Sequence, residues 1–324
     1  MSLSIYPLLI EPIFQYRLWG GRKLASVLHM NLPADMPVGE AWILSDRDDF
    51  PSVVANGALE GRKLSELIQE SPDLYLGDLA AKYSRYPLLL KFLDAREMLS
   101  VQVHPSDNDE DYLPAGEFGK TEAWVVLEAE PDSSIFAGVQ PGTKASDLAA
   151  MSAGSANKIL ASFLPKVGDG VFLRAGTVHA LGGGVVIFEV QQNSDVTFRL
   201  FDWDRVDAKT GLTRELHIEK GIAVTDFEMG AVGPVVPLVE SPITERVFDC
   251  EFFTLWRHMA NSSFKVGAPG LPRVVICVEG NGTLTFGGES YRFSQGQVYF
   301  LLAAAGISEF KPEGEAVLLE VGVN

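Results

Sequence analysis

The sequence predicts a mainly β protein built from two β-barrel or jelly-roll modules. Its length of 324 residues suits roughly two domains, and 47% hydrophobic residues can form two sizeable cores. Short strand-like runs separated by Gly-rich turns recur over residues 168–203 and again over 247–323. Regular short strands of this kind are typical of sandwiches and barrels.

The chain divides at a Gly- and Pro-rich stretch. We expect a first module at residues 1–229, a linker at 230–245 and a second module at 246–324. Within the first module, apolar residues recur at helical spacing in three insertions. We expect these helices within residues 63–86, 144–164 and 213–227. The early strands are expected at 5–10, 41–44, 88–95 and 122–128.

Composition narrows the class of partner and the compartment. A formal charge of −17 argues against nucleic acid or an anionic membrane, because both select a positive surface. It leaves an anionic small molecule open, since the nearest cations set the potential of a pocket. Cys250 and Cys277 lack the spacing of a disulfide or metal motif. With no membrane-length apolar run and no secretory signal pattern at the start, a cytoplasmic location is expected.

Residues 99–105 form the most informative predicted strand. In an extended chain Ser100, Gln102 and His104 point to one side, while the valines between them point to the other. Burying these polar groups is costly unless a metal or a polar ligand satisfies them. The strand therefore predicts one wall of a site.

A second stretch, Gly168 to His179, resembles the second conserved motif of the cupin superfamily, which delivers a metal-binding His into a small β-barrel. Arg174 stands where that motif usually has Pro, which leaves open a change in substrate fit. The companion motif usually offers His-x-His and a Glu. Here Gln102-x-His104 and Glu122 occupy those places.

Further phrases occur in order between residues 19 and 205. They are Trp19-Gly-Gly, Gly39-Glu-Ala-Trp42, Lys91-Phe-Leu-Asp94, Leu99-Ser-Val-Gln-Val-His-Pro105, Gly119-Lys-Thr-Glu-Ala-Trp124, Ala175-Gly-Thr-Val-His-Ala180, Gln191-Gln-Asn-Ser-Asp195 and Phe198-Arg-Leu-Phe-Asp-Trp-Asp-Arg205. With these, the chain resembles the class I mannose-6-phosphate isomerases, in the short bacterial form. That form has a metal-bearing cupin followed by a smaller, metal-free one. His258 is the only histidine of the second module, and no acidic partner is evident at ligand spacing.

The resemblance implies one divalent metal ion held by Gln102, His104, Glu122 and His179. Two imidazoles, a carboxylate and an amide oxygen leave coordination positions open for substrate, and zinc suits such a set where no redox step is needed. Glu189 and Gln191 share a strand face and are candidates to border the sugar.

The resemblance also implies reversible interconversion of mannose 6-phosphate and fructose 6-phosphate through a cis-enediol. It places Arg199 beside the reacting carbons. For the phosphate, Ser100 and Lys120 fit best, with Lys91 as a second cation. Lys91 has an alternative as an ion-pair partner of Asp94 or Glu97. A homo-oligomer is compatible with the sequence.

Two rival functions stay open at this point. One is a metal-dependent cupin oxygenase that uses iron, although such enzymes usually fill the ligand set with more histidines. The other is a non-catalytic sugar-phosphate-binding cupin. Such a sensor would be expected to lose Arg199 or a metal ligand, and the sequence keeps them all.

Overall fold

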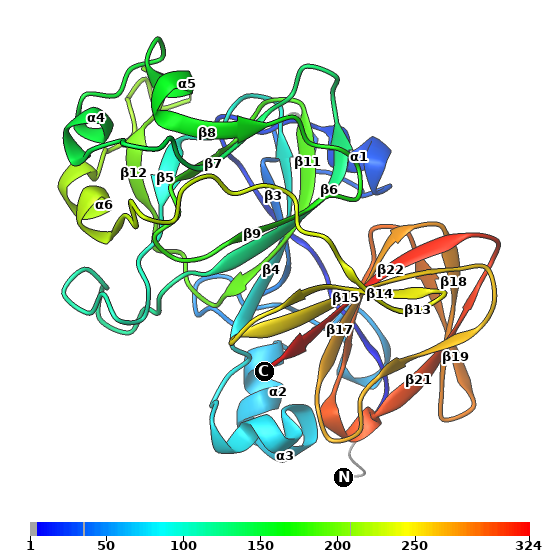
Figure 1. The fold of residues 1–324 in the computed structure, drawn as a ribbon. Coiled ribbons are helices and arrows are strands. Elements are labelled where there is room, and N and C mark those ends of the chain that lie inside the picture. The colour runs from blue at the N-terminus through cyan, green and yellow to red at the C-terminus, as the bar shows by residue number, and fades with distance from the viewer. Residues whose placement is uncertain (1–4, 35, 208) are drawn as a thin grey trace.

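The computed structural model describes residues 5–34, 36–207 and 209–324. Its strands form four antiparallel sheets that pair into two cupin-type barrels, drawn blue to yellow-green and yellow to red in Figure 1. The predicted mainly β class is therefore confirmed. Residues 1–4, at the start of the predicted first module, lie outside the described part.

The first barrel pairs a six-stranded sheet with a five-stranded one. The six-stranded sheet runs β2 (Ile13–Gln15), β3 (Glu40–Leu44), β4 (Leu88–Ala95), β11 (Val185–Gln192), β6 (Glu122–Ala129) and β9 (Gly170–Leu173). The five-stranded sheet runs β12 (Phe198–Phe201), β5 (Val101–Val103), β10 (His179–Leu181), β7 (Ile135–Val139) and β8 (Leu160–Phe163). The strand predicted at 99–105 is thus shorter than expected, but its central residues pair as a strand.

The second barrel pairs a seven-stranded sheet with a four-stranded one. The larger sheet runs β1 (Leu8–Leu9), β20 (Val298–Leu301), β17 (Arg273–Glu279), β22 (Ala316–Val323), β15 (Phe253–Ala260), β14 (Thr244–Asp249) and β13 (Leu238–Ser241). The smaller sheet runs β16 (Phe264–Gly267), β21 (Ile307–Pro312), β18 (Asn281–Phe286) and β19 (Glu289–Ser294).

Short helices form within each predicted insertion. They are α2 (Leu64–Glu70), α3 (Pro72–Tyr75) and the 3-10 turn η2 (Gly77–Ala81) in the first, α4 (Ala145–Ala149) and α5 (Ala156–Ile159) in the second, and α6 (Ile218–Val224) in the third. The others are α1 (Lys23–Val27), η1 (Gly57–Leu59) and η3 (Ala303–Ala305). Helices α4, α5 and α6 lie beside the five-stranded sheet (Figure 1), where Leu148, Ile159 and Val224 join the apolar cluster on its outer face.

The six-stranded sheet is buried on both faces, and this positions the site. All eight residues of β4, and all eight of β11, are buried. One face packs against the second barrel, and the other lines the interior of the first. Along each central strand the inward residues change from apolar to polar: Leu93 to Lys91 in β4, Ile187 to Glu189 in β11, and Val126 to Glu122 in β6. One end of the barrel is therefore an apolar core and the other a polar site.

The division of the chain differs in two respects from the expected one. Strand β1 pairs with β20, so the start of the chain belongs to the sheet of the second barrel rather than to the first module. The predicted linker at 230–245 contains β13 and the start of β14, which form a hairpin. One apolar cluster joins residues of both barrels, including Phe188 and Phe300. Hydrophobic burial at this junction favours one continuous core, which local sequence patterns do not reveal.

Candidate active site

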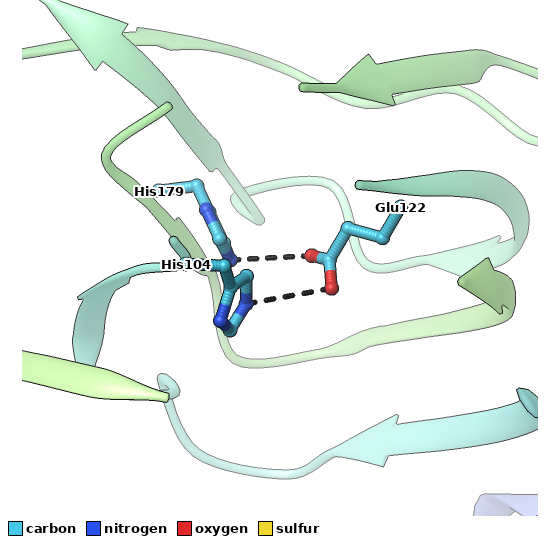
Figure 2. A group of neighbouring side chains, drawn as sticks. All are labelled: His104, Glu122 and His179. Atoms are coloured by element: carbon cyan, nitrogen blue, oxygen red, sulfur yellow. Dashed lines mark ion pairs between the residues drawn. The ribbon is translucent and has the colours of Figure 1, made fainter. Parts of the chain in front are cut away.

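Three buried side chains from three strands or strand ends meet inside the first barrel. His179 begins β10, Glu122 begins β6, and His104 directly follows β5. His104 Nε2 lies 3.5 Å from Glu122 Oε2, and His179 Nε2 lies 3.2 Å from Glu122 Oε1. Figure 2 shows the two imidazoles on the same side of the carboxylate, each facing one oxygen. The three ligand atoms lie within 4.8 Å of one another.

Backbone carbonyls fix which nitrogen of each imidazole faces the carboxylate. His104 Nδ1 lies 2.8 Å from the carbonyl oxygen of Val196, and His179 Nδ1 lies 2.9 Å from that of Thr177. A carbonyl oxygen only accepts, so each Nδ1 must carry the proton. The lone pair of each Nε2 then points into the site, which is the arrangement of metal-binding histidines.

The donor atoms of this cluster fit a metal ion. His104 Nε2 and both oxygens of Glu122 are buried without a hydrogen-bond partner of suitable geometry among the described residues. Leaving such atoms unsatisfied is costly. Burial and the charge of Lys120 hold the pKa of His104 well below its usual value, which keeps its nitrogen free to bind. The cluster therefore suits a single metal ion.

Lys120 adds a positive charge directly beside this cluster. Its Nζ lies 2.8 Å from Glu122 Oε2, and both side chains are almost fully buried. Burial alone raises the pKa of Glu122, but the charge of Lys120 and the neighbouring histidines hold it well below the usual range. The carboxylate is thus ionised and available as a ligand.

Gln102, the fourth predicted ligand, lies at the edge of the cluster. Its Nε2 is 3.2 Å from His179 Nε2, and its Oε1 accepts a hydrogen bond of 3.4 Å from Ser100 Oγ. Because the proton of His179 is on Nδ1, the amide Nε2 of Gln102 donates to the lone pair of His179 Nε2, and a flip of the amide would bring Oε1 to this point instead, as a ligand atom. Its place as a ligand stays a prediction.

A cavity of about 380 Å³ opens beside the cluster. It is lined by six predicted residues outside the triad, namely Ser100, Gln102, Lys120, Lys91, Arg199 and Glu189, together with several that were not predicted. The lining residues on which the argument depends are Ser100, Gln102, Lys120, Lys91 and Arg199, with Arg17, Glu40, Glu189, Asp195 and Arg214. A volume of this size suits a small molecule.

Arg199 enters the cavity from β12. It is partly buried, and its Nε is buried without a hydrogen-bond partner among the described residues. Its Nη1 donates to the carbonyl oxygen of Glu215 at 2.9 Å. Burial and the nearby charge of Arg214 lower its pKa to about 10. The guanidinium is therefore still charged at neutral pH and has a free donor for a ligand.

Comparisons with known proteins show the family to which the chain belongs. Residues 8–132 match the family model described as phosphomannose isomerase type I, catalytic domain. The chain is 36% identical over 324 residues to mannose-6-phosphate isomerase ManA of Bacillus subtilis, covering 97% of this chain and 98% of the relative. The chain belongs to the type I mannose-6-phosphate isomerase family.

Two further members of this family extend the match. The mannose-6-phosphate isomerase of Streptococcus mutans is 35% identical over 90% of each chain. The crystal structure of the mannose 6-phosphate isomerase from Bacillus subtilis superposes with a TM-score of 0.88 at 29% identity, over 97% of this chain and 99% of that one. In the described part of this chain, every helix is too short or too polar to cross a membrane.

Lys91 belongs to a larger ionic network than the predicted single ion pair. Its Nζ is 3.5 Å from Glu189 and 3.9 Å from both Glu40 and Asp195, and it lies over the ring of Trp42 at 5.0 Å. Its closest acidic neighbours thus face the cavity, whereas the alternative paired it with Asp94 or Glu97. Its role toward phosphate stays a prediction.

Sequence reasoning on this isomerase missed Arg17, Glu40 and Arg214. Glu40 accepts hydrogen bonds from Arg17 Nε at 2.8 Å and from Trp42 Nε1 at 2.7 Å. Burial opposes its ionisation, but the charges of Arg17 and Lys91 lower its pKa to about 2. The phrase Gly39-Glu-Ala-Trp42, one of those that carry the family resemblance, could have indicated that Glu40 belongs to the site. For Arg17 and Arg214, no motif pointed to the cavity.

Three other expectations are resolved by position. Glu189 lines the cavity, but Gln191 is fully buried and donates to backbone carbonyls of residues 192 and 194. Arg174 is exposed and does not line the cavity. His258 of the second barrel has an acidic partner after all, since its Nε2 lies 3.1 Å from Glu320. These two residues are diagonal neighbours on the paired strands β15 and β22, which their sequence separation conceals.

Proposed function

We propose that this protein interconverts mannose 6-phosphate and fructose 6-phosphate, the reaction named for its relatives. The observation that supports it best is the buried cluster of His104, Glu122 and His179, in which His104 Nε2 and both Glu122 oxygens lack a hydrogen-bond partner of suitable geometry among the described residues. The same cavity holds Lys120 and Arg199, which suit an anionic substrate. Isomerisation moves a proton between C1 and C2 and passes through a cis-enediol.

We propose zinc as the divalent ion, with Gln102, His104, Glu122 and His179 as its ligands. Nitrogen and carboxylate donors suit zinc, and a fourth weak amide ligand leaves room for sugar oxygens. When bound, a divalent ion acts as a Lewis acid that stabilises negative charge on those oxygens. The carbonyl acceptors behind His104 and His179 hold both rings in place for this task.

Arg199 is proposed to stabilise the negative oxygen that develops during proton transfer. Its unpartnered Nε and its charge at neutral pH supply a donor that is already in place before the reaction. Preorganised donors of this type often contribute the largest share of rate acceleration. Lys120, held beside Glu122, adds a second positive charge to the lining of the cavity.

Glu189 is proposed to carry the proton between the two carbons. Of the three carboxylates that line the cavity, Glu40 is fixed in its ionised form by Arg17, and Asp195 is half exposed. Glu189 is buried, and its Oε2 accepts a hydrogen bond of 2.9 Å from Trp124. Burial and the charge of Glu122 raise its pKa. A raised carboxyl pKa lies closer to working pH, as proton transfer needs.

The deciding experiment measures fructose 6-phosphate formed from mannose 6-phosphate. The purified protein is assayed before chelation, after chelation and after return of zinc, manganese or iron, with metal content determined each time. We expect activity that is lost on chelation and restored best by zinc. A protein fully loaded with metal but without turnover would instead support a sugar-phosphate-binding cupin, and oxygen consumption would support an oxygenase.

We also propose that the protein works in the cytoplasm. Cys250 and Cys277 are both free thiols, which suits a reducing compartment. The substrate proposed here, a phosphorylated hexose, is an intracellular class of metabolite. Self-association of the chain stays a prediction.

A further inference from the structure

The positive charges of the cavity are not equally balanced by acids. Lys120 is paired with Glu122, and Lys91 has Glu189, Glu40 and Asp195 within 4 Å. These two lysines therefore have acidic partners inside or beside the cavity. A dianionic phosphate would compete there with carboxylates that are already in place.

A second group of cations in the cavity has fewer acids to balance it. Asp202 is the shared partner of Arg205 and Arg214, each with a closest contact of 2.5 Å. Arg199 also lies near Asp202. The other acidic side chain near Arg199 is that of Glu215, which is largely exposed. Of the three arginines that share this buried carboxylate, Arg199 and Arg214 line the cavity, so the charges that face a ligand are only partly balanced and favour an anion.

Only one of the two arginines paired with Asp202 faces the cavity. Arg214 lines it, whereas Arg205 does not and instead donates to the carbonyl oxygen of Met98. Arg214 holds Asp202 through Nε and Nη2, at 2.8 and 2.5 Å. Among the described residues its Nη1 has no hydrogen-bond partner, which leaves a donor for a ligand.

Ser100 also lines the cavity. The residues that precede it are bonded to the turn that carries Asp202: the carbonyl oxygen of Leu99 accepts a hydrogen bond of 2.7 Å from Trp203 Nε1, and that of Met98 accepts one from Arg205. The segment that leads to Ser100 is therefore held against the turn whose Asp202 holds Arg214.

We infer that Arg214 binds the phosphate of the substrate in this cavity, with Asp202 as the residue that positions it. This inference rests on the proposed function and assigns the phosphate to a residue outside the expected set of Ser100, Lys120 and Lys91. A guanidinium suits this task because its planar donors match the oxygens of a phosphate monoester. Asp202 restrains the side chain, so less entropy is lost on binding.

The test compares Arg214→Gln with a matched control, Arg205→Gln, which removes the other partner of Asp202 without changing the lining of the cavity. Each variant is characterised by the kinetics of mannose 6-phosphate turnover and by titration of inorganic phosphate in a calorimeter. For Arg214→Gln we expect kcat/KM, and the affinity for inorganic phosphate, to fall about 10- to 100-fold. Arg205→Gln should stay within about twofold, and Arg214→Lys should recover part of the loss because it keeps the charge.

Thermal unfolding of each variant separates loss of binding from loss of folding. The inference is overturned if folded Arg214→Gln binds phosphate and turns over substrate like wild type, or if Arg205→Gln loses as much. Wild-type protein that binds phosphate through Arg214 but forms no product would contradict the proposed reaction and leave this inference standing. Wild-type activity together with an unaffected Arg214→Gln variant would support the proposed reaction and contradict this inference.

Discussion

Arg199 of β12 lies directly opposite Gln102 of β5, and Gln102 lies opposite His179 of β10 on its other side. Residues directly opposite in an antiparallel pair are about 4.5–5.5 Å apart and share one face of the sheet. One strand thus has the arginine on one flank and the proposed ligand His179 on the other. The sheet itself fixes the distance between the positive charge and the proposed ion.

Replacing Arg199 with Ala should remove most of the turnover while leaving the metal in place. The loss of a preorganised donor at a developing oxyanion typically lowers kcat about 100- to 1,000-fold. Steady-state kinetics and metal analysis on the same preparation measure both quantities. Wild-type turnover by a fully loaded Arg199→Ala variant would show that the role assigned to this residue is wrong.

Replacing His179 with Ala should empty the metal site. Only Glu122, His104 and the weaker amide ligand would remain, and the water that fills the gap cannot replace a nitrogen donor held by the backbone. Metal analysis after dialysis is the measurement, with His29→Ala as the control because that side chain is exposed and outside the cluster. Equal metal content in the two variants would exclude His179 as a ligand.

Replacing Glu40 with Gln should destabilise the fold at neutral pH. The folded pKa of Glu40, about 2, lies below its ordinary value of 4.5, so its ion pair with Arg17 stabilises the fold fully above pH 4.5. That contribution is lost as the pH falls from 4.5 toward 2. A difference of this size corresponds to ~3 kcal/mol.

Denaturant unfolding of wild type and Glu40→Gln between pH 3 and 8 measures this effect. The gap in free energy of unfolding should be widest above pH 5 and should narrow in acid. Glu11→Gln, at an exposed position, serves as the control for removal of one carboxylate. A gap that does not change with pH would mean that the ion pair does not determine the stability difference.

Replacing Asp46 with Asn should stabilise the protein at neutral pH. Burial raises the pKa of Asp46 from 3.8 to about 6, and its Oδ1 is buried without a hydrogen-bond partner in the described part of the chain. The folded state therefore holds the proton more tightly than the unfolded chain does. Stability is greatest below pH 3.8 and is lost as the pH rises through 6, by up to ~3 kcal/mol.

The Asp46→Asn variant would keep an acceptor for the amide of Tyr86, which lies 2.7 Å from Oδ2 of Asp46, without a charge. Chemical unfolding at pH 7.5 should show Asp46→Asn above wild type, and the two should converge near pH 4. Asp132→Asn, at an exposed turn, should show no such dependence. A variant less stable than wild type at pH 7.5 would contradict the predicted cost of the buried charge.

The sequence by itself determined the parts of this protein that depend on local order. Alternation along residues 99–105 placed Ser100, Gln102 and His104 on one side, and the motif around Gly176 identified His179 before any strand pairing was known. Helical spacing located the three insertions, although the helices within them are shorter than the expected ranges. These features follow from the 2.0 and 3.6 periods of strands and helices.

Only the tertiary structure decided which distant residues share the cavity and which sheet each strand joins. Arg17 and Arg214, nearly 200 residues apart, line the same space, and Leu8–Leu9 completes a sheet of the second barrel. Such pairings are set by burial of whole sheet faces and by closure of the barrels, to which many separated segments contribute. Local periodicity fixes the direction of a side chain, but the packing of the folded chain decides what that side chain meets.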